Sequence, residues 1–230
     1  MHIRTRSYSL VELASSILGL VAFLTTVGAT AQTKTAPFNP SASINQTAYQ
    51  VVNRTITSLT ETGKKGIRFS AAEGVGIAWL SDTKFTEGSI EFDVRGKDIL
   101  QRSFVGVAFH GQDDQTYESV YFRPFNFRST DPLRKIHAVQ YVYAPKFEFQ
   151  TLRDTRKDEF ENAVVPTPEP TAWFHAKVDV RAGRIRVFVN HAQTPSLDVP
   201  TLNPTSAGKR IGFWVGNNSD GDVANLKLTK

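Results

Sequence analysis

The sequence predicts an all-β protein in which two antiparallel sheets pack as a β-sandwich. Short segments of alternating apolar and polar residues recur between turn residues along most of the chain, and helical periodicity is scarce. Roughly ten to twelve short strands can be placed in this way, which is typical of a two-sheet sandwich. The clearest strands form a hairpin at residues 173–190, whose apolar face needs a second sheet to cover it.

The hairpin is predicted from its period of two. Apolar residues occupy every second position of residues 176–180 (AKVDV) and of residues 185–189 (IRVFV), and Ala182-Gly183 forms the turn. A slip of one residue would move Val178 and Val187 into water, so the alternation also fixes the register of the pair.

The N-terminal residues predict export. Basic residues are followed by an apolar run at residues 14–24 and by Ala29-Thr30-Ala31, which is the pattern of a signal peptide cleaved after residue 31. The apolar run is shorter than the roughly 20 residues of a spanning helix, so a stable membrane span is the weaker reading. We therefore expect a signal peptide at residues 1–31, a flexible tether at 32–45, one domain at 46–230, and a secreted or periplasmic protein.

Composition narrows the function classes. The 230 residues include 16 Phe, which is enough for one sizeable core, and they include no Cys, so disulfides are excluded. The net charge of the full chain is +5, and basic residues are mixed with acidic ones instead of forming a basic patch. We therefore expect no nucleic-acid partner.

The remaining strands follow in chain order. They are expected near residues 55–59, 67–70, 75–80, 89–95, 104–110, 117–123, 137–143, 210–216 and 223–228. Residues 145–170 form a long charged segment closed by prolines, with one short helix around residues 153–162. The sequence leaves open whether this segment closes over a binding site.

Several of these fragments, taken in order, resemble a known superfamily. They are residues 85–96 (FTEGSIEFDVRG), 104–114 (FVGVAFHGQDD), 117–127 (YESVYFRPFNF), the hairpin, and 211–228 (IGFWVGNNSDGDVANLKL). Together they resemble the concanavalin A-like lectin/glucanase superfamily, most closely laminin-G-like jelly rolls and bacterial secreted domains of the 3-keto-disaccharide hydrolase type. The resemblance implies a jelly-roll sandwich whose concave sheet carries the site, and a carbohydrate or glycoconjugate as the partner.

The strand at residues 117–123 carries the main candidate site. Its alternation places Tyr117, Tyr121 and Arg123 on one face, and His110 of the neighbouring strand is expected on that same outer face. Aromatic rings beside basic side chains suit a sugar, because rings stack on its apolar faces while arginine and histidine donate hydrogen bonds. Asn126 and Gln140 are expected to extend this surface.

Glu118 is the candidate catalytic residue. It occupies one of the alternating positions of the strand that are expected to face the core, so its carboxylate must be paired or lie at a strand end. Either environment could shift its pKa into the range needed for acid–base catalysis. Asp113 and Asp114 are alternatives for the same role. An ordinary exposed sheet face with a Glu118 ion pair explains the pattern equally well.

Three other features have weaker functional interpretations. Glu91 and Asp93 share a strand face like paired catalytic carboxylates, although an exposed face whose acids pair with Arg95 is the simpler reading. Trp79 and Trp214 are expected in packing more than in sugar stacking. The turn at residues 217–222 could bind Ca²⁺, but a plain hairpin turn with Gly221 at positive φ explains it.

His110, His175 and His191 do not have the spacing of a transition-metal site, so such a site is not expected. The sequence as a whole leaves two functions open. One is a hydrolase acting on glycosides, of the 3-keto-glycoside type, and the other is a non-catalytic, lectin-like carbohydrate-binding module. The sequence does not specify the sugar, the linkage, the oligomeric state or whether a metal is bound.

Overall fold

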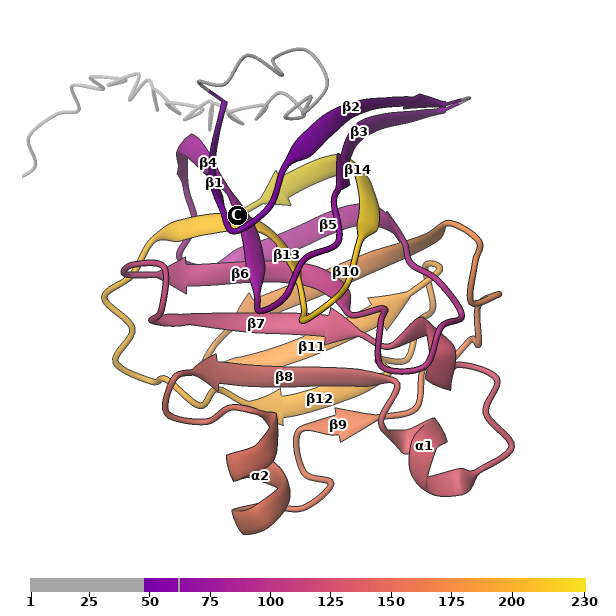
Figure 1. The fold of residues 1–230 in the computed structure, drawn as a ribbon. Coiled ribbons are helices and arrows are strands. Elements are labelled where there is room, and N and C mark those ends of the chain that lie inside the picture. The colour runs from indigo at the N-terminus through magenta and orange to yellow at the C-terminus, as the bar shows by residue number, and fades with distance from the viewer. Residues whose placement is uncertain (1–47, 62) are drawn as a thin grey trace, which may run out of the picture. The chain divides into compact units, whose positions relative to one another are not determined.

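The computed structural model describes residues 48–61 and 63–230, and these fold into two packed sheets (Figure 1). The described residues contain fourteen strands, seven in each sheet, and all neighbouring strands are antiparallel. The predicted all-β sandwich is therefore confirmed. The predicted signal peptide at 1–31 and the tether at 32–45 lie outside the described residues.

The spatial order of the strands in each sheet differs from their order in the chain. From one edge to the other, sheet A contains β1 (Tyr49–Val52), β4 (Gly76–Lys84), β13 (Arg210–Val215), β6 (Val105–Gly111), β7 (Tyr117–Phe122), β8 (Val139–Ala144) and β9 (Glu161–Asn162). Sheet B contains β12 (Leu197–Pro200), β11 (Arg184–Val189), β10 (Phe174–Arg181), β5 (Gly88–Arg95), β14 (Gly221–Thr229), β3 (Lys64–Phe69) and β2 (Ile56–Glu61).

The hairpin of β10 and β11 forms as predicted. Val178 pairs with Val187, and burial alternates along both strands. Ala182 and Gly183 both have positive φ, 50° and 70°, which gives the two-residue turn whose twist matches that of the strands.

Aromatic residues join the two sheets. The rings of Phe92 on β5 and Phe213 on β13 lie 6.2 Å apart, and those of Phe122 on β7 and Phe174 on β10 lie 5.0 Å apart, both pairs edge to face. All four side chains are fully or almost fully buried. Packing between the sheets therefore accounts for the core, as the large number of phenylalanines indicates.

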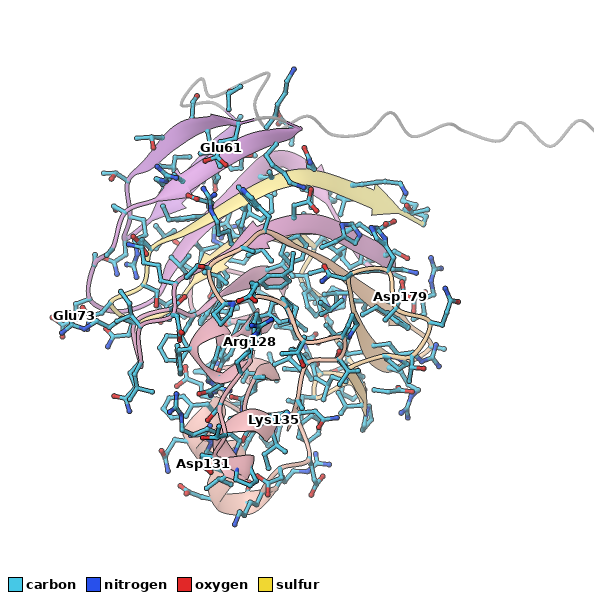
Figure 2. All side chains as sticks on the ribbon, turned by 90° about the vertical axis from the view of Figure 1, so that its right-hand side faces the viewer. Glu61, Glu73, Arg128, Asp131, Lys135 and Asp179 are labelled. Carbon is cyan, nitrogen blue, oxygen red and sulfur yellow. The ribbon has the colours of Figure 1, made fainter. Side chains whose placement is uncertain are left out.

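Three short helices lie at the β8–β9 end of sheet A, η2 (Pro124–Asn126), α1 (Pro132–Ile136) and α2 (Phe149–Thr155) (Figure 1). The side chain of Asp131 caps α1 by accepting a hydrogen bond from the Leu133 amide at 2.9 Å. Figure 2 shows Asp131 and Lys135 at the end of the molecule opposite Glu61 of β2.

The helices of the structure differ from the one predicted from the sequence. The helix expected around residues 153–162 is α2, which begins and ends earlier, and α1 was not expected. No helix in residues 48–61 and 63–230 has the length and apolar character of a membrane span.

The turn at residues 217–222 differs from its prediction as a hairpin turn. It joins β13 of sheet A to β14 of sheet B, so the chain crosses between the sheets at this point. Asn218, and not Gly221, has the positive φ, 54°. Gly221 is needed for another reason, because a Cβ atom there would lie 2.5 Å from Cγ1 of Val105.

Candidate functional site

A hollow of about 670 Å³ lies on the outer face of sheet A, which faces away from sheet B. Its floor is formed by β7, β8 and β13, and its walls come from the segment 100–104, η2, α1 and α2. This volume is within the range of small-molecule binding sites in proteins.

Two aromatic rings form one wall. Trp214, Gly106, Tyr121 and Gln140 lie in one row across β13, β6, β7 and β8. Because Gly106 has no side chain, the rings of Trp214 and Tyr121 stack above it with centroids 4.7 Å apart. A Cβ at Gly106 would lie only 2.6 Å from the Cα of Tyr121, so glycine is required there.

The next row forms the floor, and its side chains are small. Gly212, Ala108, Ser119 and Val142 follow one another across the same strands. Ser119 lines the hollow, is fully buried, and its Oγ has no hydrogen-bond partner among the described residues. A buried hydroxyl without a partner is unfavourable, so this position is suited to a polar group of a ligand.

Tyr117 closes the hollow on the side of Ala144. Nε1 of Trp214 donates a hydrogen bond to the Tyr117 hydroxyl at 3.3 Å, and the ring of Trp79 packs edge to face against Tyr117 at 5.9 Å. Burial raises the pKa of the Tyr117 and Tyr121 hydroxyls. Both phenols are therefore neutral near pH 7.

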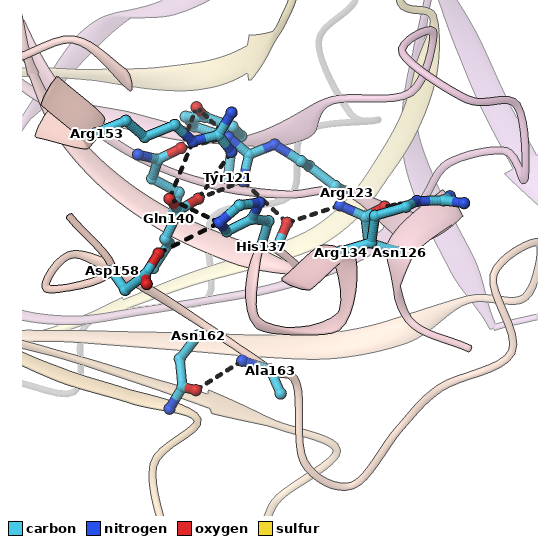
Figure 3. Close-up of polar contacts among 11 residues, drawn as sticks. Tyr121, Arg123, Asn126, Arg134, His137, Gln140, Arg153, Asp158, Asn162 and Ala163 are labelled. Atoms are coloured by element: carbon cyan, nitrogen blue, oxygen red, sulfur yellow. Dashed lines mark hydrogen bonds and ion pairs between the residues drawn. The ribbon is translucent and has the colours of Figure 1, made fainter. Parts of the chain in front are cut away.

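Arg123 lies at the other end of β7, and its guanidinium is held on all sides (Figure 3). It donates to the backbone oxygen of His137 at 2.9 Å, to Oε2 of Glu161 at 3.2 Å and to the Tyr121 hydroxyl at 3.1 Å. It also donates to Oε1 of Gln140. A guanidinium fixed in this way keeps its orientation at low conformational cost.

Glu161 joins three basic side chains. Arg153 donates to both of its carboxylate oxygens at 3.1 Å, Arg123 donates to Oε2, and Nε2 of His137 lies 3.3 Å from Oε1. Burial alone would lower the pKa of Arg153, but the bonds and charge of Glu161 outweigh it and raise that pKa.

His137, Asp158 and Glu161 also bring three possible metal ligands within 4.8 Å of one another. The two arginines, Arg123 and Arg153, already occupy the oxygens of Glu161 and would repel a divalent cation. These residues fit an arginine–carboxylate cluster better than a metal site.

Asn126 and Arg134 complete the hollow beside α1 (Figure 3). Nδ2 of Asn126 donates to the His137 backbone oxygen at 3.0 Å, and its Oδ1 accepts from Nε of Arg134 at 3.2 Å. Arg134 also donates through Nη2 to the Phe125 backbone oxygen at 2.9 Å.

The structure therefore brings four of the seven predicted site residues to the hollow, namely Tyr117, Tyr121, Arg123 and Asn126. Gln140 lies beside them, buried and bonded to Tyr121 and Arg123. Their roles in binding stay predictions.

His110 is placed differently from its prediction, and the reason is a β-bulge. Gly111 pairs with Arg210 and Ala108 with Gly212, so Phe109 and His110 together oppose the single residue Ile211. His110 has φ 50°, and its ring does not line the hollow. The strict alternation of side chains between the two faces of the strand, which predicted that His110 points outward, is interrupted at this residue.

The ring of His110 instead binds interior groups. Nδ1 lies 2.8 Å from Oε1 of Glu118 and Nε2 lies 2.6 Å from the Thr86 backbone oxygen. Burial alone would lower the pKa of His110, but Glu118 and the Thr86 carbonyl outweigh it, so the pKa is raised. Because both ring nitrogens face acceptors, the doubly protonated imidazolium satisfies the site.

Glu118 is fully buried between the sheets. Its Oε2 accepts from the Tyr141 hydroxyl and, at 3.4 Å, from Oγ1 of Thr201, and the Leu202 amide donates to the same tyrosine at 3.0 Å. This network ties β7 and β8 to the segment after β12. Glu118 does not line the hollow, and its catalytic role stays a prediction.

The two alternative candidates for the acid–base role, Asp113 and Asp114, also have structural partners. Asp113 accepts from the amides of Gln115 and Thr116, which form its own turn. Asp114 accepts from Nε1 of Trp79 and from Arg210, both at 2.9 Å, so Trp79 is a packing residue with 1% exposure.

Glu91 and Asp93 lie on the outer face of sheet B, away from the hollow. Glu91 is 3.1 Å from Nζ of Lys227, and Asp93 is 2.8 Å from Nζ of Lys64 and 3.1 Å from Nδ1 of His175. Both acids are ion-paired, as in the simpler reading, but Asp93 is buried, Glu91 is half-buried, and Arg95 pairs with Glu61 and Asp222 instead.

The acids of the turn at 217–222 are likewise paired with cations. Asp220 binds Lys97, and Asp222 binds Arg68 and Arg95. Burial raises the pKa of Asp222, but the two arginines outweigh it and lower that pKa. With their charge already neutralised, these carboxylates give no support to the Ca²⁺ site considered from the sequence.

Sequence reasoning missed part of the hollow. The missed lining residues include Phe104, Phe125, Arg134, Phe149 and Arg153, and Glu161 lies behind them. Apart from Phe104, which begins the strand expected at residues 104–110, they come from short helices and a two-residue strand, where no period of two or 3.6 shows which side chains face inward.

Comparison with models of protein families finds no match, and comparison with curated protein sequences finds none either. Solved structures do match. Carbohydrate binding module CBM66 from Bacillus subtilis is 14% identical, with a TM-score of 0.52, 80% of this chain covered and 94% of that chain. The chain has the concanavalin A-like β-sandwich fold.

Two further solved structures also match the fold of this chain. A protein of unknown function with a galectin-like fold from Bacillus subtilis is 12% identical, with a TM-score of 0.54, covering 83% of this chain and 93% of that one. The exoplasmic/lumenal domain of VIP36 in its Ca²⁺/Man-bound form is 10% identical, with a TM-score of 0.55, covering 84% and 87%. The resemblance seen in the sequence is thus confirmed for the fold, and its narrower link to 3-keto-disaccharide hydrolase-type domains stays a prediction.

Proposed function

We propose that this chain is a carbohydrate-binding module and that the hollow on sheet A holds the sugar. The observation that carries the proposal is the buried hydroxyl of Ser119, which has no partner among the described residues and lies on the floor of the hollow. A sugar hydroxyl is both a donor and an acceptor, so it matches the hydrogen-bonding capacity of this group.

The walls match the two kinds of surface that a sugar presents. The rings of Tyr117, Tyr121 and Trp214 offer apolar surface to the C–H groups of a pyranose ring. Arg123 and Asn126 are held by neighbouring groups, so they can bind hydroxyls with little loss of side-chain entropy.

The fold neighbours support the same class of ligand. One is named a carbohydrate binding module, and one is a Ca²⁺/Man-bound form. Since fold alone does not determine function, the argument depends on the side chains of the hollow. The signal peptide predicted at residues 1–31 would bring such a module to glycans outside the cytoplasm.

Binding is favoured over hydrolysis by the position of the acids. Glycoside hydrolysis ordinarily uses two carboxyl groups beside the scissile bond. Among the described residues that line the hollow, Glu148 is the only carboxylate, and Glu118 is enclosed between the sheets. A hydrolase of the 3-keto-glycoside type is therefore the second reading.

The test is binding of the full chain to an array of oligosaccharides, followed by calorimetry on those retained. We expect Trp214→Ala to weaken binding about tenfold or more, because truncation of a central aromatic contact removes roughly 2 kcal/mol. Trp173→Ala is the matched control, since Trp173 contacts Glu61 of β2 and Arg95 of β5 and does not line the hollow. Equal losses in the two variants would contradict the proposal.

Ser119→Ala provides a variant that leaves the fold intact. It removes only a hydroxyl that has no partner among the described residues, so we expect unchanged or slightly raised thermal stability together with weaker sugar binding. Unchanged affinity in this variant would exclude Ser119 as a ligand contact.

Product analysis by mass spectrometry separates the two readings. The full chain is incubated with oligosaccharides and 3-keto-glycosides, beside a folded Glu118→Gln variant. Intact sugars in both reactions are expected for a binding module. Cleavage by the parent chain that Glu118→Gln abolishes would instead establish the hydrolase.

A further inference from the structure

Charge around the hollow is uneven. The described residues that line it include three arginines, Arg123, Arg134 and Arg153, but only one acid, Glu148. Glu148 is exposed and lies at the start of α2, near the Ala144 end of β8. The excess of positive charge therefore lies at the end of the hollow next to α1.

Two of these arginines are neutralised by one carboxylate. Arg123 and Arg153 both bind Glu161, whose side chain is 2% exposed. His137 contacts the same carboxylate and also Asp158, at 3.4 Å. The acids of this cluster are thus already engaged by cations and do not supply a counter-charge to a third arginine.

Arg134 is that third arginine. None of the ion pairs among the described residues includes it, and its two hydrogen bonds go to neutral oxygens, Oδ1 of Asn126 and the backbone oxygen of Phe125. The carboxylate nearest in sequence, Asp131, accepts from the Leu133 amide at the start of α1. Arg134 is half-buried, so its charge is only partly solvated.

We infer that the sugar bound in this hollow carries a carboxylate, as a uronic acid does, and that Arg134 binds that group. The inference deepens the proposed function and rests on it. Nη1 of Arg134 has no partner among the described residues, and a planar guanidinium matches a planar carboxylate. The bonds to Asn126 and Phe125 fix the guanidinium before the ligand arrives.

The test compares charged and neutral sugars of the same shape. The full chain is titrated with oligomers of galacturonate, glucuronate and mannuronate, each beside its neutral counterpart. We expect at least one acid to bind about tenfold or more tightly than its counterpart, because a hydrogen bond between a guanidinium and a carboxylate is stronger than one between a guanidinium and a neutral hydroxyl. The difference should shrink as salt is raised.

Arg134→Gln should reduce the affinity for that acid to the affinity for its neutral counterpart, and Arg134→Lys should restore part of it. Lys135→Gln is the matched control, since Lys135 is an exposed neighbour on α1 that does not line the hollow. If the parent chain binds neutral sugars as tightly as every acid, or if Lys135→Gln has the same effect as Arg134→Gln, the inference is wrong and the proposed function stands. If no sugar of either kind binds, the proposed function fails with it.

Discussion

The outer faces of β7 and β10 differ, although each strand is the third from an edge of its seven-stranded sheet. All six residues of β7 are buried, on both faces of sheet A. In β10 burial alternates, and the outward residues His175, Lys177 and Asp179 are partly exposed and take part in ion pairs. Two strands with the same position in their sheets therefore have opposite surroundings.

The difference shows where a binding site is expected in this fold. The outer face of β10 follows the simple rule that one face of an antiparallel strand is solvated. The outer face of β7 breaks that rule, because short helices and the segment 100–104 stand over it and enclose a hollow. A strand whose polar face is buried needs partners for its polar groups, and in Ser119 one such group has none among the described residues.

The strongest test of the comparison removes one carboxylate from each strand. Glu118→Ala leaves the imidazolium of His110 and the Tyr141 hydroxyl without their partner, so we expect a loss of about 3–5 kcal/mol in the free energy of unfolding. Asp179→Ala on β10 should cost about 1 kcal/mol, because the ion pair of Asp179 with Lys177 is partly exposed. Urea unfolding measures both variants, and similar losses would contradict the contrast.

A second test uses pH from neutral to alkaline. The pKa of His110 is raised by Glu118 and the Thr86 carbonyl despite burial, so its contribution to stability is fully present below about pH 6.5 and is lost as pH rises through the folded-state pKa. Stability should fall by at most about 1.4 kcal/mol per pH unit, the limit for one proton. His110→Gln should lose this slope in urea unfolding at pH 6 to 9, whereas an unchanged slope would assign it to another group.

A third test concerns sheet B, where the pH dependence has the opposite sign. Burial would raise the pKa of Asp93, but His175, Lys64 and Asn225 outweigh it and lower the pKa to about 2. Its contribution is therefore present above about pH 4 and is lost as pH falls toward 2, and because the Asp93 side chain is largely buried it amounts to at most about 2–3 kcal/mol. Asp93→Asn should flatten stability over that range, and a steeper fall in the variant would contradict this assignment.

The fold was predictable because its strands are locally regular. The period of two in residues 176–180 and 185–189 predicts β10 and β11 with their register, and the alternation of residues 117–123 places Tyr117, Tyr121 and Arg123 on one face. In each case, the information is contained in a few consecutive residues.

The rest of the site was less predictable because it depends on distant pairing. The bulge that turns His110 inward arises where β6 meets β13, about one hundred residues later in the chain. Glu161 reaches Arg123 only through β9, a strand of two residues. Arg134 lies on a helix of five residues, too short for a helical period to indicate its orientation.

The crossing from β13 to β14 has a consequence for biosynthesis. β13 inserts between β4 and β6 in one sheet, and β14 inserts between β5 and β3 in the other, although both follow these strands in the chain. Until residues 210–229 leave the ribosome, each sheet lacks an interior strand and its neighbours keep unpaired edges. We therefore expect folding after most of the chain has been synthesised, with exposed edges that a chaperone would have to protect.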